Sequence, residues 1–235
     1  MKQGFEGISF TEICRLFGRS RQAWYEASQR NTKELLQEGL IVQWVAAIRS
    51  YVRTTQSYHH YRKWPDLLNG YRPNKPNQVW VSDITFLRTE SGFIYLSVIT
   101  DAYSRKIVGY HLSQQLKASG CIAALNKAIK ERKNYLNELI HHSDRGIQYC
   151  CDEYVQILQA HNIHISMTQS GSPYDNAIAE RVNGILKQEF KLDQLFKSYS
   201  AAIQPVSQAI YAYNHVRPHL SCSLQTPGKK HYLPP

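Results

Sequence analysis

The sequence lacks the features that mark membrane-spanning, secreted and zinc-binding proteins. No apolar run approaches the 18 residues that a membrane span requires, and the first residues lack the apolar core of a signal peptide. The five cysteines are odd in number and form no Cys-x-x-Cys pair. They are Cys14, Cys121, Cys150, Cys151 and Cys222. We therefore expect a cytoplasmic protein with no membrane partner, whose cysteines are free thiols and hold no zinc.

Acidic residues are also scarce relative to basic ones. The chain has 18 Asp and Glu against 28 Lys and Arg, which gives a net charge of +10. Such a basic protein most often has a polyanionic partner, and DNA is the leading one. At 235 residues, the chain can hold one full domain and a smaller appendage.

Two of the acidic residues lie in patterns typical of a functional site. Asp83 belongs to a stretch of alternating apolar and polar residues, rich in β-branched and aromatic types, which predicts a strand. Asp144 follows a short apolar run and precedes the turn signal Arg145-Gly146. Open α/β sheets build their sites at such strand ends.

A third acid, Glu180, lies on a predicted helix that follows the break at residues 171–173. Glu180, Asn183, Gly184 and Lys187 are spaced i, i+3, i+4 and i+7, so they share one stripe of that helix. A carboxylate, an amide and a lysine on one helix face suit a metal ion next to a nucleic-acid backbone.

We interpret Asp83, Asp144 and Glu180 as ligands of Mg²⁺ or Mn²⁺. Mg²⁺ prefers hard oxygen ligands and takes only a few carboxylates, which leaves positions for water and phosphate oxygens. Two such ions can activate an attacking oxygen and stabilise a leaving one in phosphodiester chemistry. The alternative is three solvated or salt-bridged acids, which is the usual situation of any single acid. The 35 residues between Asp144 and Glu180 favour the metal site.

This interval and several local strings resemble the integrase catalytic core of bacterial insertion-sequence transposases. The strings are Trp80-Val81-Ser82-Asp83-Ile84-Thr85, His142-Ser143-Asp144-Arg145-Gly146, Asn176-Ala177 followed by Glu180, Tyr213-Asn214-His215-Val216-Arg217-Pro218-His219, and Thr226-Pro227. They are most similar to the second-frame, integrase-like product of the family that pairs it with a small helix-turn-helix protein. Retroviral integrases are more distant relatives.

The resemblance implies a metal-dependent DNA transposase that cleaves strands and transfers 3′-hydroxyl ends. Asp83, Asp144 and Glu180 would be the catalytic and metal-binding residues. The residues expected to contact DNA or to support the site are Lys187, Asn183, Arg145, Gln148, His142, Arg217 and Arg21. The implied partners are terminal inverted repeats and target DNA at the nucleoid, further copies of the chain, and a helix-turn-helix protein from an upstream frame.

The chain is expected to contain three parts. Residues 1–50 are a helical region that resembles a helix-turn-helix, although a plain helical hairpin fits the pattern equally well. Residues 51–76 are a basic and aromatic linker, either following a phosphate backbone or packed on the core. Residues 77–235 are the catalytic core. Relatives carry a further winged-helix-like segment before the linker, so this chain is shortened there relative to the family.

The core is predicted as an α/β ribonuclease H-like fold, a five-stranded mixed sheet with flanking helices. Predicted strands are residues 78–87, 92–101, 106–112, 138–143 and 163–167, and predicted helices include 118–134, 152–161 and 200–215. Residues 168–175 are expected to form a loop beside the site. Asp101 is interpreted as a turn acid that pairs with Arg105, outside the site.

Two other functions stay open at this point. One is a catalytically silent DNA-binding remnant of a transposase, favoured by the shortened N-terminal region. The other is a nuclease of the ribonuclease H type, which would use the same metal chemistry. The three acids argue against the first alternative, and the 35-residue interval with the string at 213–219 argues against the second.

Overall fold

The computed structural model describes residues 57–68, 70–132, 138–169 and 177–232. The chain divides into two units between Val52 and Arg53, and all described residues belong to the second unit. The predicted helical region of residues 1–50, with Arg21, lies outside the described residues, as does most of the predicted loop at 168–175. Those expectations, and the three-part domain division, stay predictions.

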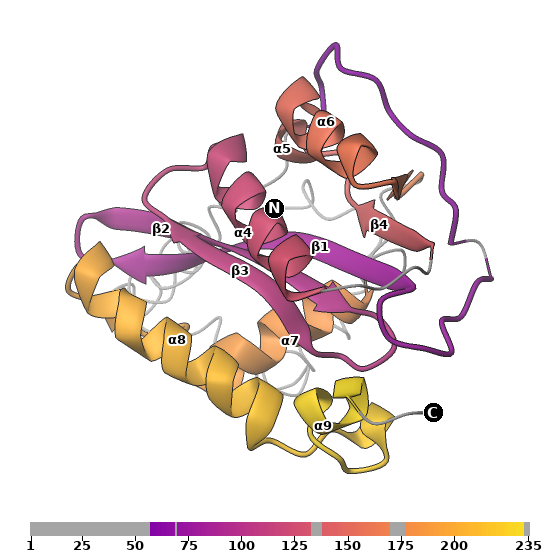
Figure 1. Ribbon diagram of the computed structural model, residues 1–235. Coiled ribbons are helices and arrows are strands. Elements are labelled where there is room, and N and C mark those ends of the chain that lie inside the picture. Colours follow the sequence, from indigo (N-terminus) through magenta and orange to yellow (C-terminus); the bar gives the residue numbers. More distant parts are fainter. Residues whose placement is uncertain (1–56, 69, 133–137, 170–176, 233–235) are drawn as a thin grey trace, which may run out of the picture. The chain divides into compact units, whose positions relative to one another are not determined.

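The described chain alternates strands and helices around one sheet (Figure 1). The strands are β1 (Val79–Thr89), β2 (Gly92–Asp101), β3 (Ile107–Ser113), β4 (Leu139–Ser143), β5 (Ile163–Met167) and the short β6 (Leu195–Phe196). The helices are α4 (Ala118–Glu131), α5 (Ile147–Cys150), α6 (Asp152–Ala160), α7 (Ala177–Gln188), α8 (Tyr199–His215), the 3₁₀ helix η2 (Leu220–Cys222) and α9 (Pro227–Tyr232). The five predicted strands are confirmed within one or two residues.

The sheet has the order β3-β2-β1-β4-β5. β1, β2 and β3 form the predicted antiparallel meander, whereas β4 pairs parallel with β1 and β5 pairs parallel with β4. β6 adds a sixth strand, which pairs with the far end of β1 at Arg88 and Thr89. The sequence analysis did not predict β6 or α5, because two and four residues carry no periodicity.

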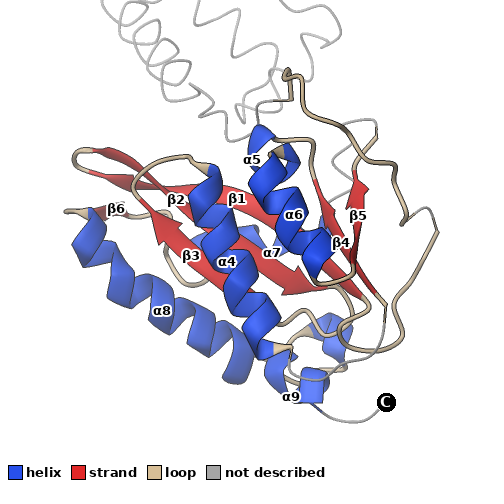
Figure 2. Cartoon of the chain, turned by 45° about the horizontal axis from the view of Figure 1, so that its top comes forward, coloured by secondary structure: helices blue, strands red, loops and turns tan. Residues whose placement is uncertain are grey.

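Helices cover both faces of the sheet, and each face has its own apolar core (Figure 2). On one face, Trp80 and Ile84 of β1 pack with residues of α4, α5 and α6. On the other face, Leu87 of β1 packs with residues of α7 and α8. This alternation follows from the two-residue period of a strand, which turns successive side chains to opposite faces.

Two side-chain features fix the helices against the edge strand β3. A Cβ at Gly109 would lie 2.3 Å from the backbone oxygen of Ala124, so only glycine lets α4 approach β3 this closely. On the other side, the Asn214 amide of α8 accepts a hydrogen bond from the N–H of Ile107 (2.9 Å) and donates one to its carbonyl oxygen (2.9 Å). Asn214 therefore takes the place of a neighbouring strand at this position.

The predicted pairing of Asp101 with Arg105 is wrong for the side chains. The Asp101 carboxylate is fully buried and accepts hydrogen bonds from the backbone N–H of Asn77 and from the N–H and hydroxyl of Ser104, each at 2.7 Å. Its Oδ1 also lies 3.7 Å from Nδ1 of His231 in α9. Asp101 is thus the centre of a buried network that ties the C-terminal helix to the sheet.

No helix in the described ranges is long and apolar enough to cross a membrane.

Candidate active site

The register of two parallel strands brings Asp83 and Asp144 side by side. The last pair that joins β1 to β4 is Val81 with His142, an offset of 61 residues. Asp83 and Asp144 are each two residues further along, and 83 plus the same offset gives 144. β4 ends at Ser143, while β1 continues to Thr89. The two carboxylates therefore lie where the strands part, with each side chain partly exposed.

A tight turn holds the Asp144 carboxylate at the end of β4. The N–H of Gly146 donates a hydrogen bond to Oδ1 of Asp144 (2.9 Å). A Cβ at residue 146 would lie 2.9 Å from that same oxygen and 3.2 Å from Oε1 of Gln148, so glycine keeps this space open. Gln148 is buried, and its Oε1 has no hydrogen-bond partner among the described residues. Gln148 thus places an oxygen without a hydrogen-bond partner in the described chain beside Asp144, and its predicted role stays a prediction.

Helix α7 presents its polar stripe to β1, as its sequence spacing predicted. Nδ2 of Asn183 donates a hydrogen bond to Oδ2 of Asp83 (2.7 Å), and Oδ1 of the buried Asn183 has no hydrogen-bond partner in the described chain. One turn later, the Lys187 ammonium lies 4.3 Å from the ring centroid of Phe86 in β1. Asn183 therefore orients the Asp83 carboxylate, and Lys187 is held close to β1 instead of extending into solvent.

Asp83 has an unusual protonation equilibrium. The pKa of Asp83 is raised to about 7, chiefly by burial, next by the neighbouring Asp144 carboxylate and, to a smaller degree, by Glu180. Hydrogen bonds from the Ile84 backbone and Asn183 act in the opposite direction. A carboxyl group that is costly to ionise beside other acids is the electrostatic situation that a bound divalent cation relieves.

Glu180 lies one turn before Asn183 on α7 and is exposed. The negative charge of Glu180 raises the pKa of Asp83, so the fold brings Glu180 to the same side of the sheet. Among the described residues, no three His, Cys, Asp or Glu side chains lie close enough together to form a ready metal site. The structure thus joins Asp83 and Asp144 closely and leaves Glu180 at the margin of the pair.

The oxygen donors at this place fit a hard divalent cation. Asp83 and Asp144 supply adjacent carboxylates, and the amide oxygens of Asn183 and Gln148 are buried without hydrogen-bond partners in the described chain. Mg²⁺ and Mn²⁺ prefer such oxygen ligands over nitrogen and sulfur. These residues could therefore hold the predicted ion, with Glu180 completing the set.

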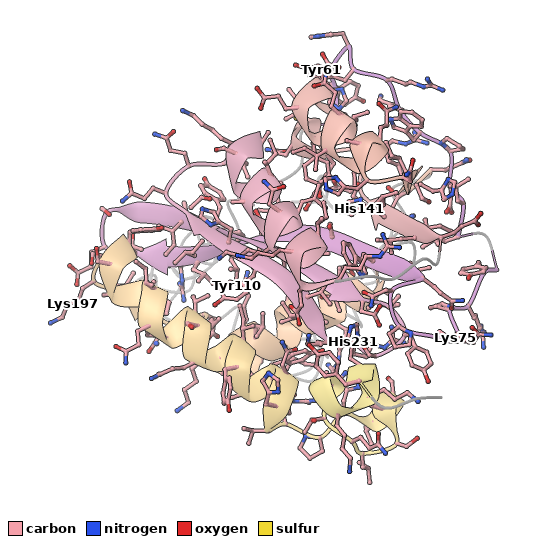
Figure 3. The ribbon with its side chains drawn as sticks, in the orientation of Figure 1. Tyr61, Lys75, Tyr110, His141, Lys197 and His231 are labelled. Atoms are coloured by element: carbon pink, nitrogen blue, oxygen red, sulfur yellow. The ribbon has the colours of Figure 1, made fainter. Side chains whose placement is uncertain are left out.

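Two histidines next to Asp144 have supporting positions. His142 is buried with 1% of its surface exposed, and its Nδ1 forms a 2.8 Å hydrogen bond with the Ser166 hydroxyl. The prediction that His142 contacts DNA therefore does not fit its burial. His141 was not predicted as a site residue, and its Nε2 lies 2.7 Å from the Ser82 hydroxyl and 2.9 Å from that of Tyr154 (Figure 3). Burial lowers the pKa of His141 to about 3, so this ring is neutral.

The remaining predicted DNA contacts lie in different surroundings. Arg145 is partly buried at the turn after β4, and its backbone carbonyl accepts a hydrogen bond from Nε2 of His59 (2.9 Å). Arg217 forms a two-bond ion pair with Glu189, in which Nη2 donates to Oε1 at 2.7 Å. This pairing keeps the Arg217 guanidinium on the protein surface beside α7. A DNA contact there would compete with Glu189.

Comparison with known proteins gives consistent matches. The integrase core domain family matches residues 73–173 and, in a second part, residues 161–227. A 31 kDa protein of insertion element IS600 from Shigella sonnei is 34% identical over 216 residues, which cover 86% of this chain and 78% of that protein. The InsF transposase of IS3A from Escherichia coli K12 is 38% identical over 153 residues, 65% of this chain and 53% of its own length. The chain thus spans about half of that transposase.

Two solved structures share the fold. The HTLV-2 integrase catalytic core domain, solved with magnesium in a trimeric form, has a TM-score of 0.55 and 20% identity, covering 68% of this chain and all of that one. A chain of the simian T-cell lymphotropic virus intasome, solved with a PP2A regulatory subunit, has a TM-score of 0.58 and 20% identity over 96% of this chain and 75% of its own. The predicted ribonuclease H-like fold is therefore confirmed.

Proposed function

Since this chain belongs to the integrase-core family of insertion-element transposases, we propose that its own site performs metal-dependent DNA strand cleavage and transfer of 3′-hydroxyl ends. The family is a class of polynucleotidyl transferases. The observation that carries the proposal for this chain is the common register of Asp83 and Asp144 at the point where β1 and β4 part.

The proposed roles follow from the positions of the side chains. Asp83, Asp144 and Glu180 hold Mg²⁺ or Mn²⁺, whose chemistry is to activate an attacking water or 3′-hydroxyl and to stabilise the leaving oxygen. Asn183 fixes the orientation of the Asp83 carboxylate through its 2.7 Å hydrogen bond. Lys187 brings a positive charge to the same side of β1, where a DNA phosphate would approach Asp83.

Supporting residues act through the backbone of β4 and the turn after it. Gln148 lies beside Asp144 across Gly146, and His141 and His142 bind hydroxyl groups of neighbouring elements. These contacts keep the end of β4 in one position, which matters because a metal site tolerates only small displacements of its ligands. Arg145 and Arg217 are proposed as weaker phosphate contacts on the rim, and Arg21 as a contact of the N-terminal region.

The proposal extends to partners and place of action. Terminal inverted repeats and target DNA are the proposed substrates, and the net charge of +10 suits both. The chain would act as a multimer at the nucleoid, together with a helix-turn-helix protein from an upstream frame. The oligomeric solved relatives, an intasome and a trimeric core domain, support the multimer.

Joining of a labelled end of the parent element to plasmid DNA in Mg²⁺ tests the function directly. Glu180→Gln should lower joining at least about 100-fold, since it removes a charge that acts on the reacting groups. Glu153→Gln provides a matched control, because Glu153 is exposed in the first turn of α6. Its joining should equal that of the wild type.

The other outcomes separate the alternatives. Joining by Glu180→Gln at the wild-type rate would contradict the three-carboxylate site. Binding of terminal repeats without joining by the wild-type chain would favour a catalytically silent remnant. Cleavage of DNA and RNA–DNA hybrids without joining would favour a nuclease.

A further inference from the structure

Residues 57–68 form an extended segment, here called the strap, that runs beside β5 and reaches the turn after β4 (Figure 1). Hydrogen bonds to β5 and to the turn after β4 fasten it. The backbone N–H of Met167 donates to the Pro65 carbonyl (3.2 Å), and the N–H of Leu67 donates to the Ser166 hydroxyl (2.8 Å). Nε2 of His59 donates to the carbonyl of Arg145 (2.9 Å), one residue after Asp144. The strap is thus part of the rim of the candidate active site.

The two faces of the strap differ in character. Tyr61 and Trp64 are partly buried and pack against the apolar core that underlies α4, α5 and α6. The strap's one acid, Asp66, also turns inward, where its Oδ1 accepts hydrogen bonds from the Leu68 N–H (2.7 Å) and the Ser166 hydroxyl (3.4 Å). The inward face of the strap therefore packs on the core, which was one of the two interpretations of the linker.

The outward face is basic and aromatic and contains no acid. Tyr58 is 97% exposed, and His60, Arg62 and Lys63 are exposed beside it. The His60 ring stacks on Tyr61 with 4.5 Å between centroids, and the Arg62 guanidinium lies 4.2 Å from the ring centroid of Trp64. Because their ring partners are fixed to the core, His60 and Arg62 are held in place, which lowers the entropy lost when they bind a ligand.

The basic residues of the strap also share a neighbourhood with Asp144. The pKa of Cys150 is raised to about 11, chiefly by burial and next by the Asp144 carboxylate. The positive charges of Lys63 and Arg145 act in the opposite direction. Lys63, Arg145 and Asp144 therefore all lie near the Cys150 thiol at the end of α5. A cation here lies close enough to the acids to meet the backbone of a nucleic acid bound at them.

We propose that the outward face of the strap binds the phosphate backbone of the DNA strand held at Asp83 and Asp144, with Arg62 and Lys63 on phosphates and Tyr58 against a sugar or base. This inference rests on the proposed function, because it takes DNA as the substrate of that site. A basic surface with interleaved aromatic side chains suits a sugar-phosphate chain better than a protein partner. The strap then positions the substrate strand from outside the catalytic core.

Equilibrium binding over a series of salt concentrations tests the phosphate contacts. The full chain would be titrated into a fluorescent duplex carrying an end of the parent element, in Ca²⁺ or EDTA, so that no joining is needed. The test variant combines Arg62→Ala with Lys63→Ala. The control combines Lys130→Ala with Lys197→Ala, two exposed lysines elsewhere on the same unit. Figure 3 shows Tyr61 of the strap at the top of the molecule and Lys197 at its left edge, far from the strap.

Each lost phosphate contact lowers the slope of log affinity against log salt by about 0.9, so the strap variant should lose about 1.8 from that slope. The control should keep the wild-type slope. Equal losses in both variants, or none in the strap variant, would overturn the proposal. Equal melting temperatures of the two variants would show that an altered slope does not come from unfolding.

Photo-crosslinking from the strap tests its position. p-Benzoylphenylalanine would replace Tyr58 in one variant and Tyr211, which is 65% exposed on α8, in the other. Tyr58→p-benzoylphenylalanine should crosslink within a few nucleotides of the element end, and the Tyr211 variant should not. Crosslinks from both, or from neither, would refute the placement. If the chain binds and crosslinks DNA but joins no ends, the proposed function is contradicted and the strap proposal still stands.

Discussion

Asp83 and Asp101 are acids on the paired strands β1 and β2, yet their surroundings differ, since the Asp101 side chain is fully buried and that of Asp83 is partly exposed. Asp101 has three hydrogen bonds of 2.7 Å and a histidine at 3.7 Å. Asp83 has one side-chain donor, Asn183, and two further carboxylates in its neighbourhood. Asp101 thus has partners that match its charge, whereas Asp83, the proposed catalytic acid, has partners that leave its charge uncompensated.

The largest stability effect is expected at the satisfied acid. Asp101→Ala removes the acceptor of the Asn77 and Ser104 N–H groups in a fully buried place, so we expect a loss of about 3 kcal/mol in the free energy of unfolding. Urea denaturation measures it. The exposed Asp193→Ala should stay within about 0.5 kcal/mol of the wild type. If the two variants lost equal stability, the network around Asp101 would not be structural.

At Asp83, in contrast, we expect removal of the carboxylate to increase the free energy of unfolding in metal-free buffer. The folded carboxyl has a pKa of about 7 against 3.8 for the free group. Between these values the unfolded state binds fewer protons, so wild-type stability falls as pH rises from about 4 to about 7. Asp83→Asn removes this fall. We expect it to be more stable than the wild type by about 1–3 kcal/mol at pH 8, after allowance for relaxation, and nearly equal at pH 4.

Urea denaturation in EDTA at the two pH values measures this difference. An equal gain at both pH values would show that the benefit comes from packing and not from the ionisation of Asp83. A loss of stability at pH 8 would mean that the carboxylate is better compensated than its neighbours indicate.

A smaller effect is expected at Asn183, the side-chain donor to Asp83. Asn183→Ala frees the Asp83 carboxylate to rotate, so Mn²⁺ binding should weaken by about tenfold, as for other residues that orient a metal ligand. Titration calorimetry measures the affinity without any DNA. Gln188→Ala, exposed on the same helix, is the control and should bind as the wild type does. Unchanged affinity in Asn183→Ala would remove Asn183 from the site.

The sequence alone predicted the fold and the adjacent positions of Asp83 and Asp144 at a strand end, because strand alternation, helix spacing and the family strings are all local signals; the catalytic role of the three acids stays a prediction. It did not reveal the partner of Asp101, since His231 lies 130 positions away and only the folded chain brings α9 to that place. It expected Asn183 to contact DNA, whereas the structure bonds it to Asp83. The helical spacing placed Asn183 on the same face of α7 as Lys187, but it could not show that this face contacts β1.

The strap shows a similar limit. Its composition allowed either packing on the core or contact with a phosphate backbone. Because inward and outward side chains follow one another along the strap, both are possible at once. Tyr61 faces the core while Arg62 is exposed, so the two interpretations apply to neighbouring residues. In the folded chain, the hydrogen bond from His59 to Arg145 locates the segment next to Asp144.

The shared register of β1 and β4 has a consequence for insertions and deletions. Extra residues in the connection between β3 and α4 leave the pairing of Val81 with His142 unchanged, so length variation there is compatible with the site. One residue added between Val81 and Asp83 would turn the carboxylate to the opposite face of the sheet, into the core under α4. We therefore expect functional copies of this element to vary in length in connections such as that between β3 and α4, and to keep the lengths of these few residues and of their counterparts in β4.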